Sequence, residues 1–252
     1  MRLTVLGSGA ACAGNGGNSS GYLVEESNVR ILLDCGHGVA STLVELGSPD
    51  QIDHIFISHM HADHFIDLLP LRFAVTKDMP GLPEPCGRLH LPPGGRASLA
   101  KVLEAVCFPA DFFDGVWQVC EYEPGTRVDL ADGLSARFAG GVHYIPGWAI
   151  RLDGSSSLTF TGDTAPSNEI CELARGCDLL LAEATLDAPE HGPVRGHLTA
   201  LEAAQLAKAA AVQRLMLTHF WHDADRAAAA HTARAYLDCA VLVAQDGAVL
   251  EF

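Results

Sequence analysis

The feature that most constrains this chain is a group of metal-ligand side chains that directly follows a short apolar segment. Residues 52–57 are mostly apolar and predict a strand, and His59, His61, Asp63 and His64 follow within a few positions. A strand points alternate side chains to the same side, so His59 and His61 can converge on one ion. Asp63 and His64 lie at the turn into the next predicted helix and can reach a second ion. The sequence therefore predicts a metal-binding turn.

The length and composition predict one α/β domain over residues 1–252. A chain of 252 residues with 48% hydrophobic content can bury a full core. Its formal net charge is −15, with 31 acidic and 16 basic residues. Proteins that track nucleic acid neutralise phosphates with Lys and Arg, so this charge balance argues against an extended basic surface.

The cysteines and the hydropathy pattern predict the compartment. Eight cysteines are scattered along the chain without a CxxC pair, which is typical of free thiols in a reducing compartment. No run approaches the roughly 18 apolar residues that a membrane span requires, and the first residues hold too short an apolar stretch for export. We therefore expect a cytoplasmic protein with no membrane partner.

Further candidate side chains stand where other predicted strands end. Sites in layered α/β proteins form beyond the carboxyl ends of strands, so residues distant in sequence can meet at one rim. A helix predicted over residues 200–211 begins with a capping box of Thr199 and Glu202, which leaves His197 outside the helix and free to face the site. The side chains at the strand ends are Asp34, His143, Asp163, Glu183 and His219.

These motifs resemble those of the metallo-β-lactamase superfamily, and the resemblance covers nearly the whole chain. The cluster over residues 59–64 is its first element. The motif Glu183-Ala184-Thr185 followed by His197-Leu198-Thr199 is similar to the paired motifs of the ribonuclease Z group and of related small phosphodiesterases. The remaining residues that carry the resemblance are His143, Asp163 within Thr161-Gly162-Asp163-Thr164, and His219 within Leu217-Thr218-His219.

The resemblance implies a four-layer αββα sandwich with two divalent metal ions on its upper edge. Zinc is the expected metal, and manganese or iron would also suit a mixed set of histidine and aspartate ligands. The implied ligands are His59, His61 and His143 for the first ion, Asp63, His64 and His219 for the second, and Asp163 as a bridge between the two.

Catalytic roles follow from the chemistry that such a centre needs. Two divalent ions lower the pKa of a shared water and clamp both oxygens of a phosphodiester through its displacement. The leaving alkoxide still needs a proton, which His197 can give if a carboxylate such as Glu183 fixes its tautomer. Asp63 can also accept a hydrogen bond from the attacking water. Asp34 is expected to orient a ligand histidine rather than to bind metal.

The favoured function is hydrolysis of a small phosphodiester such as a cyclic nucleotide. The alternative is a ribonuclease Z that processes the 3′ ends of transfer RNA. Ribonucleases Z hold transfer RNA with a long basic arm rich in glycine and proline, and the second half of this chain contains no such arm. A homodimer could still build a basic groove. The candidates for that groove are Arg72, Lys77, Arg88 and Arg96.

Three other functions are disfavoured. A metal-loaded binding scaffold would require gaps among the ligands, and all seven are present. A β-lactamase is disfavoured because the chain has no export signal and because Asp63, Glu183 and His197 point to phosphoesters. A thiol-ester hydrolase is disfavoured by the same three residues.

Weaker features give additional expectations. Asn18 and Ser19, in a glycine-rich loop, can touch an anionic substrate. Arg195 can offer donors to the substrate phosphate, and His222 can line the pocket. Residues 240–252 predict a tight hairpin around Asp246-Gly247.

Overall fold

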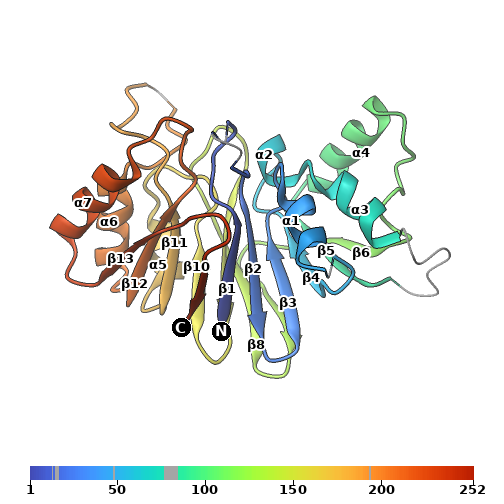
Figure 1. Ribbon diagram of the computed structural model, residues 1–252, viewed down its shortest axis with the longest axis horizontal. Helices are drawn as coiled ribbons and strands as arrows, with labels where there is room; N and C mark the ends of the chain where they lie inside the picture. Colours follow the sequence, from blue (N-terminus) through green and yellow to red (C-terminus); the bar gives the residue numbers. More distant parts are fainter. Residues whose placement is uncertain (13, 15–16, 48, 77–84, 193) are drawn as a thin grey trace.

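The computed structural model describes residues 1–252 except 13, 15–16, 48, 77–84 and 193. Two seven-stranded sheets pack face to face, and helices cover the outer face of each sheet (Figure 1). This is the predicted four-layer αββα sandwich, which the structure confirms. Both termini lie at the lower end of the sheets in this view, opposite the loops that carry most of the candidate site residues.

The first sheet contains seven strands in the order β14-β1-β2-β3-β4-β5-β6. Its strands are β1 (Arg2–Gly7), β2 (Gly21–Glu26), β3 (Val29–Leu33), β4 (His54–Phe56), β5 (Gly87–Leu91), β6 (Trp117–Glu121) and β14 (Val249–Glu251). The helices that accompany this sheet are α1 (Val39–Glu45), α2 (Ala62–Phe65), α3 (Leu68–Thr76) and α4 (Gly95–Ala105).

The second sheet has the order β13-β12-β11-β10-β9-β8-β7. Its strands are β7 (Arg127–Ala131), β8 (Leu134–Gly140), β9 (Trp148–Asp153), β10 (Ser157–Phe160), β11 (Leu179–Glu183), β12 (Arg214–Thr218) and β13 (Ala240–Val243). The helices on this side are α5 (Asn168–Ala174), α6 (Ala200–Ala209) and α7 (Arg226–Tyr236).

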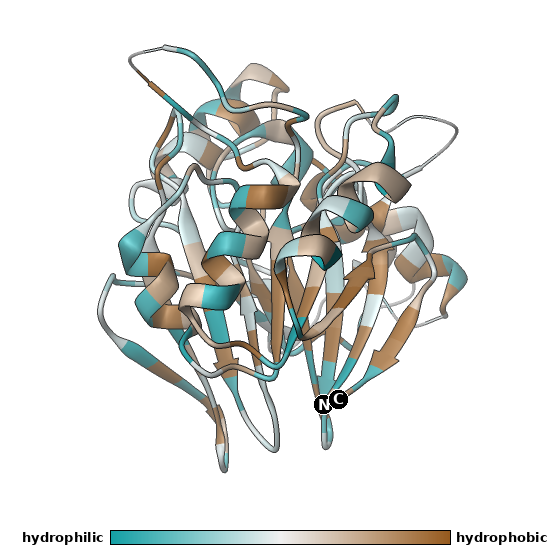
Figure 2. Cartoon of the chain, turned by 90° about the vertical axis from the view of Figure 1, so that its left-hand side faces the viewer, coloured by the Kyte–Doolittle hydropathy of each residue, from teal (hydrophilic) through white to brown (hydrophobic). Residues whose placement is uncertain are grey.

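The buried apolar side chains form three layers. Strands direct alternate side chains to both faces of each sheet, and helices bury one apolar face against a sheet. One layer fills the space between the sheets, where the rings of Tyr22 and Phe160 lie 5.2 Å apart and those of Phe56 and Phe138 lie 5.8 Å apart. The other two layers lie between each sheet and its helices. In Figure 2 the strands are mostly brown, whereas the helices in front of them alternate brown and teal. The helices therefore bury one face only.

Two predicted elements are confirmed near the site, and one predicted element differs. Helix α6 has the predicted capping box of Thr199 and Glu202, and β4 ends just before the cluster at residues 59–64. The predicted hairpin over residues 240–252 is wrong, because β13 pairs with β12 in one sheet and β14 pairs with β1 in the other. Between β13 and β14 the chain passes from one sheet to the other. Asp246 lies in this connection, and its carboxylate accepts hydrogen bonds from the backbone N–H groups of Ser8 and Asn18 beside the first sheet. Residues 77–84 of the proline-rich loop, including Lys77, lie outside the described residues.

Among the described parts of the chain, no helix combines the length and the apolar character that crossing a bilayer would require.

Candidate metal centre

The ends of four strands bring the predicted metal ligands to the upper edge of the sandwich. The segment after β4 supplies the first four of these side chains, and the loops after β8, β10 and β12 supply the other three. Glu183, the last residue of β11, lies beside them. The seven side chains gathered here are His59, His61, Asp63, His64, His143, Asp163 and His219.

The first group consists of three histidines and an aspartate. Ligand atoms of His59, His61, His143 and Asp163 all lie within 4.8 Å of one another. His61 Nδ1 is 3.1 Å from His59 Nε2 and 3.0 Å from His143 Nε2. Asp163 Oδ2 is 3.7 Å from His59 Nε2. Such spacing fits donors that surround one ion, because metal–nitrogen distances near 2 Å put neighbouring ligand atoms about 3 Å apart.

The second group consists of Asp63, His64 and His219. Asp63 Oδ2 is 3.4 Å from the Nε2 atoms of both histidines. The other aspartate, Asp163, reaches this group too, since its Oδ2 is 3.4 Å from His64 Nε2 and its Oδ1 is 3.4 Å from His219 Nε2. Asp163 therefore touches both groups, which is the geometry that a bridging carboxylate needs.

One buried carboxylate orients a histidine in each group. Asp34 is 0% exposed, and its Oδ2 accepts a hydrogen bond of 2.6 Å from His64 Nδ1. The same oxygen accepts the hydroxyl proton of Ser58 at 2.9 Å. Ser58 Oγ is then free to accept from His59 Nδ1, which lies 3.1 Å away. The geometry agrees with the expected orienting role of Asp34.

Two more histidines of the centre, His143 and His219, also have acceptors on their outer nitrogens. His143 Nδ1 donates to the carbonyl oxygen of Gly196 at 2.7 Å. Thr185 Oγ1 donates to Glu183 Oε2 at 2.6 Å and therefore accepts from His219 Nδ1 at 2.9 Å. A neutral imidazole has one N–H, so fixing it on the outer nitrogen leaves the inner nitrogen with a lone pair.

The inner nitrogens of the histidines point toward one another, which bears on whether these residues suit a metal ion. His64 and His219 bond to Asp34 and Thr185 through their Nδ1 atoms and turn their Nε2 atoms toward each other at 3.2 Å. In the neutral forms of both rings these two atoms would present facing lone pairs. Two facing lone pairs repel, and a positive charge between them removes the repulsion. This donor set therefore fits divalent cations.

Burial and the neighbouring carboxylates shift the pKa values of these histidines in opposite directions. Burial lowers the pKa values of His59, His61 and His143, which favours the neutral form that can bind metal. Burial also opposes a charge on His64, but Asp163 and Asp34 outweigh it and raise the pKa of His64 well above its usual value. The centre thus attracts a positive charge even without a metal.

His197 and Glu183 form a pair beside the metal ligands. His197 Nδ1 donates to Glu183 Oε1 at 2.9 Å. Burial opposes protonation, but this hydrogen bond and the charge of Glu183 raise the pKa of His197 to about 9. Glu183 is 1% exposed and also accepts from the backbone N–H groups of Thr164 at 2.8 Å and Leu198 at 3.2 Å. The carboxylate is thus rigidly held.

A cavity of about 310 Å³ opens onto this arrangement. Among the described residues, its walls include His197, two aromatic rings and three alanines, and contain no Lys or Arg side chain. The sequence analysis did not predict these two rings, because an aromatic residue one or two positions after a histidine gives no periodic signal. The residues that line the cavity are Ala10, Ala11, His61, Ala62, Asp63, Tyr144, Asp163, Thr185, His197, His219 and Trp221.

Three weaker expectations do not match this cavity. Arg195 donates to Glu202 Oε1 at 2.8 Å, so its guanidinium is engaged in an ion pair away from the lining. His222 is absent from the lining, whereas its neighbour Trp221 is present. The side chain of Asn18 donates to Leu6 O and Thr42 Oγ1 and therefore holds the glycine-rich loop. Ser19 likewise donates to the carbonyl oxygen of Ala10.

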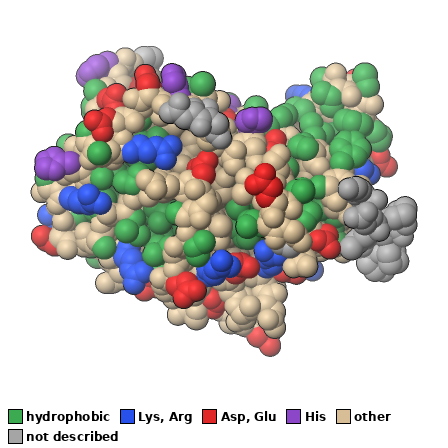
Figure 3. All heavy atoms as spheres, viewed as in Figure 1, with side chains coloured by type: hydrophobic (Ala, Val, Ile, Leu, Met, Phe, Trp, Pro, Cys, Tyr) green, Lys and Arg blue, Asp and Glu red, His purple; other side chains and the backbone are tan. Residues whose placement is uncertain are grey.

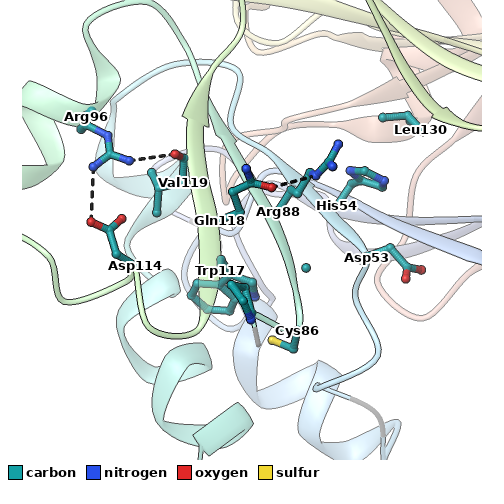
Figure 4. A pocket seen from close by; sticks show the side chains of 12 residues that line it. Asp53, His54, Cys86, Arg88, Arg96, Asp114, Trp117, Gln118, Val119 and Leu130 are labelled. Carbon is teal, nitrogen blue, oxygen red and sulfur yellow. Dashed lines mark hydrogen bonds and ion pairs between the residues drawn. The ribbon is translucent and has the colours of Figure 1, made fainter. Parts of the chain in front are cut away.

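A larger hollow of about 810 Å³ lies elsewhere, near the starts of β5 and β6 (Figure 4). Arg88 Nε donates to Gln118 Oε1, and Arg96 donates to Val119 O and Asp114. None of the seven ligand-type side chains lines this hollow. Chemistry rather than size therefore identifies the candidate site.

Comparison with known proteins decides the family. A family model described as a beta-lactamase superfamily domain matches residues 29–220, which is more than half of the chain. The chain belongs to the metallo-β-lactamase superfamily. Members with this fold and these strand-end ligands are metal-dependent hydrolases, and so is this protein.

Relatives within the superfamily cover most or all of this hydrolase. The probable metallo-hydrolase YhfI of Bacillus subtilis is 28% identical over 223 residues, which are 88% of both chains. Its crystal structure has a TM-score of 0.84 at 25% identity and covers 99% of both chains. Ribonuclease Z of Haloferax volcanii is 28% identical over 306 residues, covering 100% of this chain and 95% of the relative. A diphosphatase of the PhnP family shares the fold with a TM-score of 0.73 at 20% identity, covering 100% of this chain and 97% of the other.

Proposed function

We propose that this metallo-β-lactamase-fold hydrolase cleaves a small phosphodiester, such as a cyclic nucleotide, at a dinuclear metal centre. The observation that carries the proposal is the pair of His197 and Glu183 beside two groups of metal ligands. A thioester releases a thiolate, which hardly needs a proton, whereas a phosphodiester with an alkoxide leaving group does need a proton donor.

The ligand assignment is part of the proposal. His59, His61 and His143 hold the first ion, and Asp63, His64 and His219 hold the second, with Asp163 between them. Zinc is the metal that we propose, and manganese and iron fit the same donors. Bound divalent ions supply an activated water and neutralise charge on the phosphate oxygens.

The chain's own side chains then have distinct tasks. Asp63 lines the cavity and can accept a hydrogen bond from the attacking water. His197 Nδ1–H is occupied by Glu183, so that nitrogen carries a hydrogen and cannot bind metal, although Asp163, His197 and His219 also come within ligand distance of one another. The other ring nitrogen of His197 is left to give its proton to the leaving oxygen.

The size and charge of the site favour a small substrate. A cavity of about 310 Å³ is at the low end of the range for ligand pockets. On the face shown in Figure 3, Lys and Arg side chains stand singly among acidic ones rather than forming a stripe. The match to the Haloferax volcanii ribonuclease Z extends over 306 positions against 252 residues here, so that relative carries segments without a counterpart in this chain.

Processing of transfer RNA is the second candidate function. The sequence relationship to a protein named ribonuclease Z over the whole of this chain favours it. Both functions use the same centre and differ in what lies around it.

A substrate panel tests the proposal. The purified protein, loaded with zinc or manganese, is assayed on bis-p-nitrophenyl phosphate, on cyclic nucleotides and on a 3′-extended transfer RNA precursor. We expect hydrolysis of the small diesters and feeble cleavage of the precursor. Efficient precursor processing with cyclic nucleotides untouched would establish the ribonuclease instead.

The variant His197→Ala tests the assignment of the proton donor. It should keep its metals and lose about 10²–10⁴-fold in rate on substrates with poor leaving groups. A p-nitrophenyl ester should lose less, because its leaving group hardly needs a proton. Equal losses on both kinds of substrate would remove His197 from this role.

A further inference from the structure

Two aromatic rings line the cavity although their surroundings do not bury them. Tyr144 is 49% exposed and Trp221 is 39% exposed. Tyr144 follows the ligand His143 after β8, and Trp221 follows the ligand His219 after β12. We infer that Tyr144 and Trp221 hold a nucleobase, which makes the substrate a nucleotide phosphodiester. The inference rests on the proposed function and specifies its substrate class.

The ring of Tyr144 is held firmly on one side. It packs on Gly196 so closely that a Cβ atom there would lie 2.5 Å from the ring. The ring centroid is 4.9 Å from that of His143 and 5.7 Å from that of His197. The hydroxyl donates to Glu190, whose other oxygen accepts from the backbone N–H of Gly196. The ring is therefore preorganised while about half of its surface stays open.

The backbone of Trp221 is anchored beside the other group of ligands. Its neighbour Phe220 is buried and pairs with the N-terminal loop, donating from its N–H to Ser8 O at 3.1 Å and accepting from Ala10 N at 2.9 Å. The carbonyl oxygen of Trp221 accepts from Ala224 N at 3.2 Å. A large indole ring on a fixed backbone is thereby presented to the cavity.

The chemistry of the lining favours a flat, uncharged group near the phosphodiester. Within the part of the chain that the structure describes, no Lys or Arg side chain lines the cavity, so a second anionic group would find no partner among these residues. Small side chains at Ala10, Ala11 and Ala62 leave room next to the rings. Stacking on aromatic side chains is the usual way to hold a base without reading its edges. An alkyl or glycerol group would gain little from two flat rings.

Two substrates with the same scissile bond test this inference. The p-nitrophenyl ester of thymidine 5′-monophosphate and methyl p-nitrophenyl phosphate share the leaving group, and the first carries a nucleoside where the second carries a methyl group. We expect a lower KM for the nucleoside ester. Trp221→Ala and Tyr144→Ala should each raise that KM by roughly 5- to 150-fold, which corresponds to ~1–3 kcal/mol per stacked base. The KM of the methyl ester should change by less than about twofold.

Matched variants separate stacking from other effects. Tyr144→Phe removes the hydroxyl contact with Glu190 but keeps the ring, and Trp221→Phe keeps a flat ring, so both should retain the preference for the nucleoside ester. Titration calorimetry with adenosine 5′-monophosphate gives a readout that needs no turnover, and the two alanine variants should bind it more weakly than the phenylalanine variants.

The outcomes distinguish this inference from the function on which it rests. Equal KM values for the two esters in the wild type, or equal effects of the alanine variants on both, would overturn base stacking and leave the phosphodiesterase intact. Absence of hydrolysis of both esters by the metal-loaded protein would overturn the phosphodiesterase. In that case the calorimetry would still decide whether the rings bind a base.

Discussion

The variant Asp34→Asn should weaken metal binding at both groups, although Asp34 touches neither proposed ion. Asp34 accepts from Ser58 N at 2.7 Å, from Ser58 Oγ at 2.9 Å and from His64 Nδ1 at 2.6 Å. An asparagine keeps the shape but replaces one acceptor oxygen with an NH₂ group. Whichever way this amide is turned, a donor then faces a donor at one of these positions.

The magnitude follows from the two possible orientations. If the NH₂ group faces Ser58 N, a buried N–H loses its acceptor, which costs about 1–3 kcal/mol. If it faces His64 Nδ1, the proton of His64 must move to Nε2, and the lone pair needed for metal is lost. Changes to groups that orient metal ligands usually cost roughly 10–100-fold in affinity. We expect a loss of that order for both ions, because Asp34 fixes His64 directly and His59 through Ser58.

The assay is competition between the protein and a chelator of known zinc affinity. Ser58→Ala is the matched control, since it removes the link to His59 and leaves the bond between Asp34 and His64 in place. That control should weaken the binding of only one of the two ions. Wild-type affinity for both ions in Asp34→Asn would refute the orienting role of Asp34.

Two further predictions concern the same centre. Asp163→Ala removes the carboxylate that touches both ligand groups, so metal content by atomic emission and activity should both fall; two full metal equivalents in this variant would disprove the bridge. In the protein without metal, burial opposes a charge on His197, but the contact with Glu183 raises the pKa of His197 to about 9. Protonated His197 therefore stabilises the folded state. This contribution to the free energy of unfolding is complete below the unfolded pKa near 6.5 and is lost as pH rises through about 9. The Tm difference between metal-free wild type and His197→Gln should therefore shrink above pH 9, and a constant difference would contradict the shift.

The gathering of the seven ligand-type side chains at strand ends could be predicted because its signal is local. An apolar run followed by His or Asp marks the end of a strand, and the carboxyl ends of strands in this fold meet at one edge. His197 was predictable for a similar reason, since the capping box at Thr199 fixes where α6 begins. In each of these cases the information lies within a few residues.

The orienting role of Asp34 was expected from the sequence, but the particular side chains that it contacts could not be predicted in the same way. The link from Asp34 through Ser58 to His59 depends on β3 lying parallel to β4, which no local pattern specifies. The turn at Asp246 was predicted but its strands were assigned wrongly, because a turn signal does not say which sheet each flanking strand joins. The strands β6 and β7 went unrecognised, since each is the edge of its sheet and carries several polar residues.

The salt dependence of catalysis should distinguish a small-molecule hydrolase from a transfer RNA nuclease. Each phosphate that a protein neutralises steepens the fall of affinity with salt, and roughly six to ten contacts cost about 10³–10⁵-fold between 50 and 200 mM salt. A small diester carries one charge, so its KM should rise by about threefold at most over that range.

A dimer could still bind transfer RNA if it built a basic groove from arginines of both subunits. Three of the arginines that could form it are engaged with their own chain. Arg72 donates to Phe112 O, Arg88 to Gln118 and Arg96 to Val119 O. Binding RNA phosphates would compete with these hydrogen bonds. We therefore expect precursor transfer RNA, measured by filter binding at 50 and 200 mM salt, to bind weakly at both. Tight binding at 50 mM that collapses at 200 mM would show several phosphate contacts and would overturn the assignment to small substrates.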